Sequence, residues 1–246
     1  MNTALYDIYN GLAARFEELD VVSNNLANVN STGYKQDGVF QRLLEANLSA
    51  NPQVQGSARR MPRVATYVDF QNGDLVQTGR PMDLGIQGKG FFVVQGAAGE
   101  VYYTRDGSFS QDDTGNLLTA SGDRVMGDGA PVSIPQGERN VVTVDEEGGI
   151  SVDGIRSTSL KVVEFDDGAI LQKIGSNYFV DKGGAVPKDA ESTSVSQGFL
   201  EKSNVSAIKA MVEMMQVMRQ AESLQRTLNL ILNDVDGRVI REVARV

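Results

Sequence analysis

Four short stretches carry residue types that could bind a ligand or act on one. Residues 85–91 (Gly-Ile-Gln-Gly-Lys-Gly-Phe) have the glycines and the lysine of a phosphate loop. Residues 112–116 (Asp-Asp-Thr-Gly-Asn) offer oxygen atoms of the kind that Ca²⁺ prefers. Residues 145–147 and Asp166-Asp167 supply carboxylates, the groups that act as general acid and base, although adjacent carboxylates on a turn are usually solvated.

None of these stretches fits its chemistry completely. No Ser or Thr follows Lys89 and a strand pattern comes next, so residues 85–91 predict a tight hairpin. Residues 112–116 lack the spaced ligands and distal Glu of a calcium loop and predict a turn. The chain has no His and no Cys, which removes the usual general base, the usual zinc ligands and any Ser-His-Asp triad. We predict no catalytic residue, no cofactor and no metal site; a hydrolase using two carboxylates is an alternative with no convergent set of residues.

The composition limits the class of partner. The net charge is −9 and the pI is about 4.6, which argues against nucleic acid or an anionic membrane as the main partner. No apolar run approaches the roughly 18 residues of a membrane span, so we predict no direct membrane insertion. The first residues, Met1 to Ala4, have neither a basic region nor an apolar run, so the sequence predicts no secretory signal peptide.

The last part of the chain predicts a long helix with one narrow apolar face. From about Asn204 to Val235 the apolar residues recur at alternating steps of three and four, the heptad pattern by which one helix lies along another. This heptad face consists of Ala207, Ala210, Met214, Val217, Ala221, Leu224, Leu228, Ile231 and Val235. Ser203 or Asn204 is the predicted N-cap. Met211, Met215 and Met218 flank the face, so the helix should need more than one neighbour.

A second heptad helix is predicted at residues 4–27. Its apolar positions are Leu5, Ile8, Leu12, Leu19, Val22 and Leu26, with Phe16 filling in beside an interruption at Arg15. Both long amphipathic helices therefore lie at the ends of the chain. Each could simply pack on the domain between them, but a narrow, sustained apolar face favours packing of helix on helix.

Between the helices the period of the apolar residues changes to two. Short apolar runs separated by glycine-rich turns predict an antiparallel sheet or barrel from about Val64 to Val180. The predicted strands are Ala65–Phe70, Asp83–Gln87, Phe91–Gln95, Val101–Arg105, Val141–Val144, Ile150–Val152, Leu160–Phe165 and Asn177–Val180. A short helix at Val39–Leu44 and an exposed, extended segment at Asn47–Pro62 would connect this region to the first helix.

The predicted fold class is α+β, with long N- and C-terminal helices forming a coiled-coil-like pair and a mainly antiparallel β domain inserted between them. We predict four segments. These are residues 1–35, the N-terminal assembly helix with its turn; 36–75, a partly extended connection; 76–197, the β domain; and 198–246, the C-terminal assembly helix.

Four motifs in a fixed order resemble those of the flagellar rod and hook proteins. They are Asn24-Asn-Leu-Ala-Asn-Val-Asn-Ser-Thr-Gly-Tyr-Lys35, Gly73-Asp-Leu-Val-Gln-Thr-Gly-Arg-Pro-Met-Asp-Leu84 with Gly88-Lys-Gly-Phe-Phe-Val-Val94, Tyr103-Thr-Arg-Asp-Gly-Ser-Phe109, and Leu200-Glu-Lys-Ser-Asn-Val205. Together they span nearly the whole chain. Within the family, the length and residues 129–135 look most like the F type, with the G type next.

The resemblance implies a structural subunit of the basal-body rod, within the periplasm, that is not an enzyme. Its partners would be other copies of itself, other flagellar rod proteins and, during secretion, the flagellar export apparatus. The terminal helices would assemble into a helical tube that transmits torque and carries the export channel. The predicted assembly interface is Leu5, Ile8, Leu12, Leu19, Val22, Leu26, Asn24, Asn25, Asn28, Met211, Met214, Met215, Val217, Met218, Leu224, Leu228, Ile231 and Val235. A secreted or phage-type fibre protein that trimerises through its terminal helices is the alternative.

Overall fold

The computed structural model describes residues 2–45, 60–135, 141–165, 171–175, 177–190 and 192–243. The chain divides into two compact units. The helical unit contains Met1–Leu26, Asp37–Tyr67 and Ser206–Val246, and the β unit contains Ala27–Gln36 and Val68–Val205. The fold is the predicted α+β class, with a helix near each end of the chain and antiparallel strands between them.

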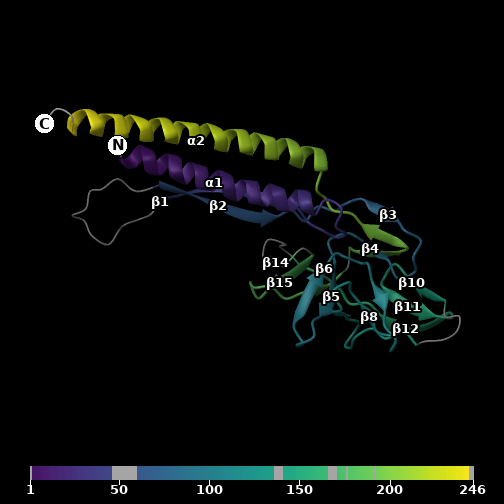
Figure 1. Cartoon of the computed structure of the whole chain (residues 1–246). Helices are drawn as coiled ribbons and strands as arrows, with labels where there is room; N and C mark the ends of the chain where they lie inside the picture. Colours follow the sequence, from purple (N-terminus) through teal and green to yellow (C-terminus); the bar gives the residue numbers. More distant parts are fainter. Residues whose placement is uncertain are drawn as a thin grey trace. The chain divides into compact units, whose positions relative to one another are not determined.

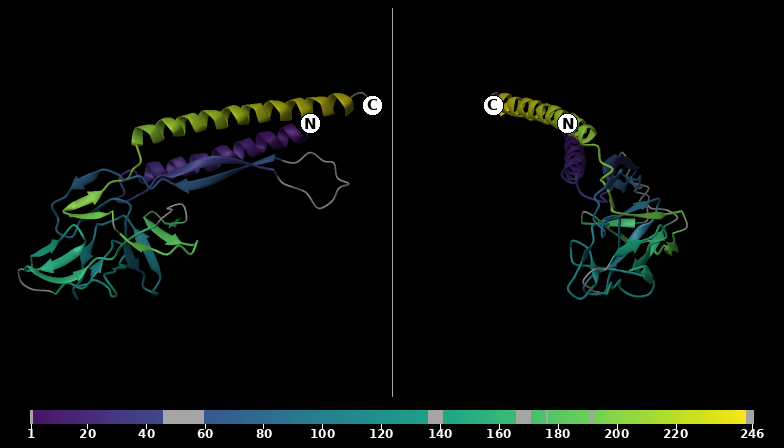
Figure 2. Two further views of the ribbon diagram at one scale, coloured as in Figure 1. Left: turned by 180° about the vertical axis from the view of Figure 1, so that it is seen from behind. Right: turned by 90° about the vertical axis from the view of Figure 1, so that its right-hand side faces the viewer.

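The helical unit is built on two helices that lie side by side. Helix α1 spans Asn2–Ala27 and helix α2 spans Ala207–Val243. They run antiparallel, so the two chain termini lie at the same end of the pair (Figures 1 and 2). A Cβ built on Gly11 of α1 would lie 3.7 Å from Leu224 Cδ1 of α2, which places these two residues at the same level. No helix in the described part of the chain is long and apolar enough to cross a membrane.

The predicted heptad face is the covered face of α2. Ala210, Val217 and Ala221 are buried, and the other described positions are partly buried: Ala207, Met214, Leu224, Leu228 and Ile231. Every other side chain of α2 from Ile208 to Asn233 is exposed. The period of the apolar residues therefore reports directly which side of the helix another element covers.

Helix α1 is covered over a wider arc. Ala14 and Val22 are buried, and the predicted positions from Leu5 to Leu26 are partly or fully buried. Phe16 does not fill the heptad face as predicted, because its side chain is half exposed. The interrupting Arg15 instead pairs with Glu18 one turn along the helix.

Two local predictions near the helices are wrong. Residues 39–44 form a strand, not a helix: β1 (Asp37–Glu45) pairs with β2 (Arg60–Val68), and the Phe40 and Tyr67 rings lie 6.2 Å apart. The segment between these strands, residues 46–59, holds most of the predicted extended region and lies outside the described residues. Helix α2 begins after Ser206, whose carbonyl accepts the Ala210 N–H at 2.9 Å, so Ser203 and Asn204 are not its N-cap.

The β unit consists of short antiparallel strands in several small sheets. Strands β3 (Leu75–Gln77) and β18 (Phe199–Glu201) pair, as do β4 (Leu84–Gln87) and β17 (Ser194–Gln197). A third sheet joins β10 (Val142–Val144), β11 (Gly149–Val152) and β12 (Ile155–Ser159). The largest sheet contains β5 (Phe91–Gln95), β6 (Val101–Thr104), β7 (Ser110–Gln111), β8 (Leu117–Leu118), β9 (Arg124–Val125), β13 (Val162–Glu164), β14 (Leu171–Ile174), β15 (Tyr178–Asp181) and β16 (Lys188–Asp189).

The eight predicted strands are all present, but the predicted hairpin at residues 85–91 is wrong. Strand β4 pairs with β17 and strand β5 pairs with β6, β9 and β13, so this stretch is a corner between two sheets. The corner is closed by the chain near Thr193, whose hydroxyl accepts the Gly90 N–H at 2.9 Å. A Cβ on Gly88, which has φ 124°, would lie 2.7 Å from the Ser192 carbonyl oxygen. Glycine is needed at this corner because no other residue fits.

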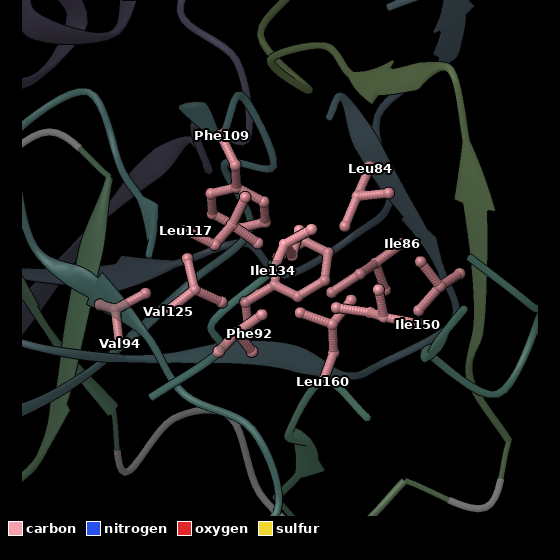
Figure 3. Close-up of a cluster of buried hydrophobic side chains, with 12 residues drawn as sticks. Leu84, Ile86, Phe92, Val94, Phe109, Leu117, Val125, Ile134, Ile150 and Leu160 are labelled. Carbon is pink, nitrogen blue, oxygen red and sulfur yellow. The ribbon is translucent and has the colours of Figure 1, made fainter. Parts of the chain in front are cut away.

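The main core of the β unit is built from side chains of several of its sheets. Figure 3 shows side chains from several strands meeting there: Leu84 and Ile86 from β4, Phe92 and Val94 from β5, Leu117 from β8 and Ile150 from β11. A second cluster on the other side of β5 contains Phe91, Val93, Val163, Phe165, Leu171 and Phe179. Strand β5 is thus buried on both faces, which explains its continuous apolar sequence.

Two valines of the largest sheet give a matched test of this core. Val94 is fully buried in β5, whereas Val101 on the neighbouring β6 is 43% exposed. Val94→Ala should lower the free energy of unfolding by about 2 kcal/mol, because buried methyl groups are lost and a cavity remains. Val101→Ala should change it by less than about 0.5 kcal/mol. Urea unfolding of both variants checks this, and equal losses would contradict the assigned core.

Candidate functional site

Of the described stretches with potential chemistry, residues 112–116 and 145–147 form turns and residues 85–91 form the corner between two sheets. The Gly88 carbonyl is occupied by Arg105 Nη2 at 2.8 Å. The Asp112 carboxylate accepts hydrogen bonds from Thr114 and Asn116 in its own turn, and Asp145 Oδ1 accepts the Gly149 N–H at 2.6 Å. Residues 166 and 167 lie outside the described part. Over the described ranges, no group of three or more Asp, Glu, His or Cys could hold a metal ion.

The most distinctive site of the β unit is a buried ion cluster centred on Glu201. One carboxylate oxygen, Oε1, accepts hydrogen bonds from Lys35 Nζ at 2.7 Å and from the Gly73 N–H at 2.8 Å. The other, Oε2, lies 3.4 Å from Arg105 Nη1. All three charged side chains are at most 1% exposed. Such burial of three charges is rare, and charged groups occupy such sites only when they are paired.

The two cations of the cluster have further partners. Lys35 Nζ donates to the Gln71 carbonyl at 2.7 Å. Arg105 reaches the Asn72 side chain at 3.3 Å and stacks its guanidinium over the Phe91 ring, 4.8 Å from the ring centre. The cluster thereby ties the segment at residues 71–73 to both cations as well as to the carboxylate.

Burial dominates the electrostatics of the two cations. Removal from water lowers the pKa of Lys35 below its usual 10.5, while the Glu201 carboxylate opposes this shift. Arg105 has a lowered pKa for the same reason, again opposed by Glu201. Two positive charges share one central carboxylate, so the loss of that carboxylate would leave both without their nearest counter-charge.

Backbone contacts extend the cluster into a junction between distant segments. The Gly33 N–H donates to the Glu201 carbonyl at 2.8 Å. Asn204 accepts the Gln36 N–H at 2.7 Å and donates to the Asp69 carbonyl at 2.9 Å. The residue predicted to cap α2 therefore cross-links the two chain segments instead.

Two glycines of the junction allow the segments to approach closely. Gly33 has φ 67°, and any Cβ there would overlap the backbone of Arg105 and Asp106. A Cβ on Gly73 would overlap the carbonyl of Lys202. Both positions therefore require glycine for steric reasons.

The four sequence motifs meet at this junction. Lys35, Gly73, Arg105 and Glu201 each belong to a different one of them, and Lys35 and Glu201 lie 166 residues apart in sequence. Sequence reasoning did not single out the three charged residues, because a lone Lys, Arg or Glu is normally solvated. The sequence feature that distinguishes these three residues is that each belongs to one of the four motifs.

The predicted assembly residues have two kinds of environment in the helical unit. Those on the heptad face of α2 and most of those on α1 are partly or fully buried within the chain, whereas Met211, Met215 and Met218 are about half exposed. The structure describes no side chain for Val235. Assembly through these residues stays a prediction.

The three predicted asparagines differ from one another. Asn25 is buried and its side chain pairs with both backbone groups of Asp37, at 2.7 and 2.9 Å, which closes the end of α1 onto the start of β1. Asn28 accepts a hydrogen bond from the Ser31 hydroxyl at 3.1 Å, and Asn24 is exposed. Asn25 therefore has a definite role inside the chain.

The fold and the junction define a class of protein in which two terminal helices flank an inserted β unit. In this class the segment that follows the first helix and the segment that precedes the second are both held by a buried ion cluster of the β unit. The chain is 31% identical to the flagellar basal-body rod protein FlgF of Caulobacter vibrioides over 229 residues, which is 93% of each chain. It is 30% identical to the flagellar basal-body rod protein FlgG of Borreliella burgdorferi, over 90% of this chain and 92% of that one. This chain belongs to the family of flagellar basal-body rod proteins, which are structural proteins.

Family models match three separate parts of the chain. Residues 8–35 match a model described as flagella basal body rod protein, and residues 85–152 match the flagellar hook protein FlgE/F/G D1 domain. Residues 196–229 match the flagellar basal body rod FlgEFG protein C-terminal model. The first and last of these regions contain Lys35 and Glu201, and the middle one contains Arg105.

The ion cluster predicts an unequal effect of one substitution at two sites. Glu201→Gln should lower the free energy of unfolding by about 3–5 kcal/mol, because Lys35 and Arg105 stay buried but lose the carboxylate that pairs with both. Glu222→Gln removes an exposed pair with Arg226 and should cost less than about 1 kcal/mol. Denaturant unfolding of both variants measures the difference; a Glu201→Gln protein as stable as the Glu222→Gln protein would contradict the role of the cluster.

The turn at Asp112 predicts a pH dependence. Hydrogen bonds from Thr114 and then Asn116 lower the pKa of Asp112 to about 2, from 3.8. The folded pKa is depressed, so its stabilising contribution is present above pH 3.8 and is lost as the pH falls through about 2. The difference in unfolding midpoint between the parent chain and Asp112→Asn should therefore shrink over this range. A carboxyl ¹³C titration centred near 3.8 would refute the assignment.

Proposed function

We propose that this chain is a rod subunit that assembles with copies of itself and with other rod proteins through α1 and α2. The assembly is a helical tube in the periplasm that transmits torque and encloses the export channel, and the flagellar export apparatus delivers the subunit. The finding that the chain belongs to the flagellar basal-body rod family supports the rod, and the exposed surface of the helical unit supports the mode of assembly.

A second apolar face on α2 is the observation that carries the proposal. Beside the heptad face lie Ile208, Met211, Val212, Met215 and Met218, all exposed by 44–77%. If an additional neighbour covers these side chains, the burial of each one stabilises the association by on the order of 1 kcal/mol. A contiguous exposed patch of this kind marks an interaction surface.

The methionines suit contacts with non-identical neighbours. Methionine is unbranched and polarisable, so it adapts to differently shaped partner surfaces. A rod subunit that meets both its own copies and other rod proteins needs such a surface. Three of the four methionines of α2 (Met211, Met215 and Met218) lie on its exposed face and only Met214 lies on its heptad face, which agrees with this requirement.

The ion cluster supports a role in carrying torque. The segment after α1 and the segment before α2 are both fixed to the core of the β unit by Lys35, Arg105 and Glu201. Force applied through either helix therefore reaches the same buried cluster along the chain. If either of these two segments were a solvated loop, it would deform under load and would transmit less force.

Reversing the character of the exposed face tests the proposal. Met211→Glu places a charge in the proposed interface while leaving the heptad face intact, so the purified chain should keep its helical circular dichroism. Because a buried unpaired charge costs several kcal/mol, host cells in which this variant replaces the parent gene should lose swimming. Gln216→Glu, on an exposed polar position of the same helix, should swim normally. Normal swimming with Met211→Glu would argue against assembly through this face.

A further inference from the structure

Two exposed apolar stripes of the helical unit share the same spacing. The α1 stripe is Tyr6, Tyr9, Ala13 and Phe16, and its three aromatic side chains are 51–61% exposed. The α2 stripe is Ile208, Met211, Met215 and Met218, which are 47–77% exposed. Both stripes advance by three, four and three residues, so each is a straight ridge of about 15 Å on its helix.

The two stripes of one chain lie at different levels along the helix pair. Gly11, at the centre of the α1 stripe, is level with Leu224. Leu224 lies about 11 residues beyond the centre of the α2 stripe, which corresponds to about 16 Å along the helix. The stripes therefore cannot cover each other within one chain, although their lengths and spacing match.

We propose that the α1 stripe of one copy packs on the α2 stripe of a second copy that is shifted by about 16 Å along the helix axis. This contact rests on the proposed function, because it specifies how two subunits of the rod would join. A shift without reversal keeps α1 antiparallel to α2 across the contact. It brings Tyr6 level with Met218, Tyr9 with Met215, Ala13 with Met211, and Phe16 with Ile208.

The antiparallel alignment separates two exposed carboxylates that the parallel alignment would bring together. The α1 stripe is followed four residues later by Asp20, and the α2 stripe is followed four residues later by Glu222. Both carboxylates are exposed. A parallel alignment would set Asp20 and Glu222 at the same level, where like charges repel. The antiparallel alignment puts them at opposite ends of the contact.

The two stripes also differ in a complementary way. One presents aromatic rings and the other presents mainly thioethers, and contacts between sulfur atoms and aromatic rings are favourable. Because the two surfaces are different, a copy that uses one stripe in a contact still exposes its other stripe to the next copy. Such a heterologous contact extends into an open series instead of closing into a symmetric dimer.

Disulfide trapping tests this contact, because the chain has no cysteine of its own. Two single variants, Tyr9→Cys and Met215→Cys, are made in full-length chains of different tag length and are oxidised under assembly conditions. We expect a mixed disulfide dimer only when both are present. Within one chain these positions are about 16 Å apart along the helices, too far for a disulfide bridge. Tyr6→Cys with Met218→Cys is a second pair with the same expectation.

The matched control uses positions at similar levels on other faces of the same helices. Asp7→Cys and Gln216→Cys are both exposed and should give no mixed dimer above background. A dimer formed by either single stripe variant alone would reveal a symmetric contact and would overturn the proposal. The same holds if the control pair cross-links as well as the stripe pairs.

Assembly of the cysteine-free parent chain is followed in parallel by sedimentation and by swimming of the host cells. If the parent assembles but neither stripe pair forms a mixed dimer, the stripe contact is wrong and the rod function stands. If the parent neither assembles nor restores swimming to cells that lack it, the proposed function fails and the contact fails with it.

Discussion

A single buried carboxylate, Glu201, is the interaction on which the junction of chain segments in the β unit depends. It balances the buried charges of Lys35 and Arg105, and it also accepts the backbone N–H of Gly73. Coulomb attraction between opposite charges is strong when they are buried. For the same reason, removing one partner and leaving the other buried and unpaired is strongly destabilising. The chain therefore has little freedom at this point: the segment after α1, the segment at residues 71–73 and the segment before α2 either come together with all charges paired or do not come together.

This constraint explains a division of roles between the two units. The β unit pairs the charged groups of its buried cluster with one another and encloses its own apolar core, with Phe92, Val94 and Phe179 fully buried. The helical unit covers one face of α2 and leaves an adjacent apolar face exposed. The proposed assembly would use both properties, since the β unit gives a defined folded subunit and the exposed apolar face of the helical unit favours association.

Sequence reasoning succeeded where the signal is local. The heptad period predicted α1 and the covered face of α2, and alternation predicted eight strands, because side-chain spacing along one element determines which side is buried. Sequence reasoning failed where the local structure is determined by contacts with segments that are distant in sequence. The corner at Gly88 depends on Thr193, the role of Asn204 depends on Gln36 and Asp69, and strand β1 depends on its pairing with β2. Lys35, Arg105 and Glu201 escaped notice because burial of a charge depends on a partner far away in sequence.

The energetics of the exposed stripes favour assembly only in an array. Covering two stripes of half-exposed side chains would gain on the order of 5–10 kcal/mol, at about 1 kcal/mol for each side chain. The loss of translational and rotational freedom on association costs roughly 4–15 kcal/mol. Each copy also carries a net charge of −9, which adds repulsion. One such contact would therefore be close to balanced and would not hold two free subunits together.

A subunit joining a growing end meets several neighbours at once, and only its first contact bears the full entropic cost. Exposed apolar stripes are in this way compatible with a monomer that stays dispersed until it reaches the end of an existing assembly.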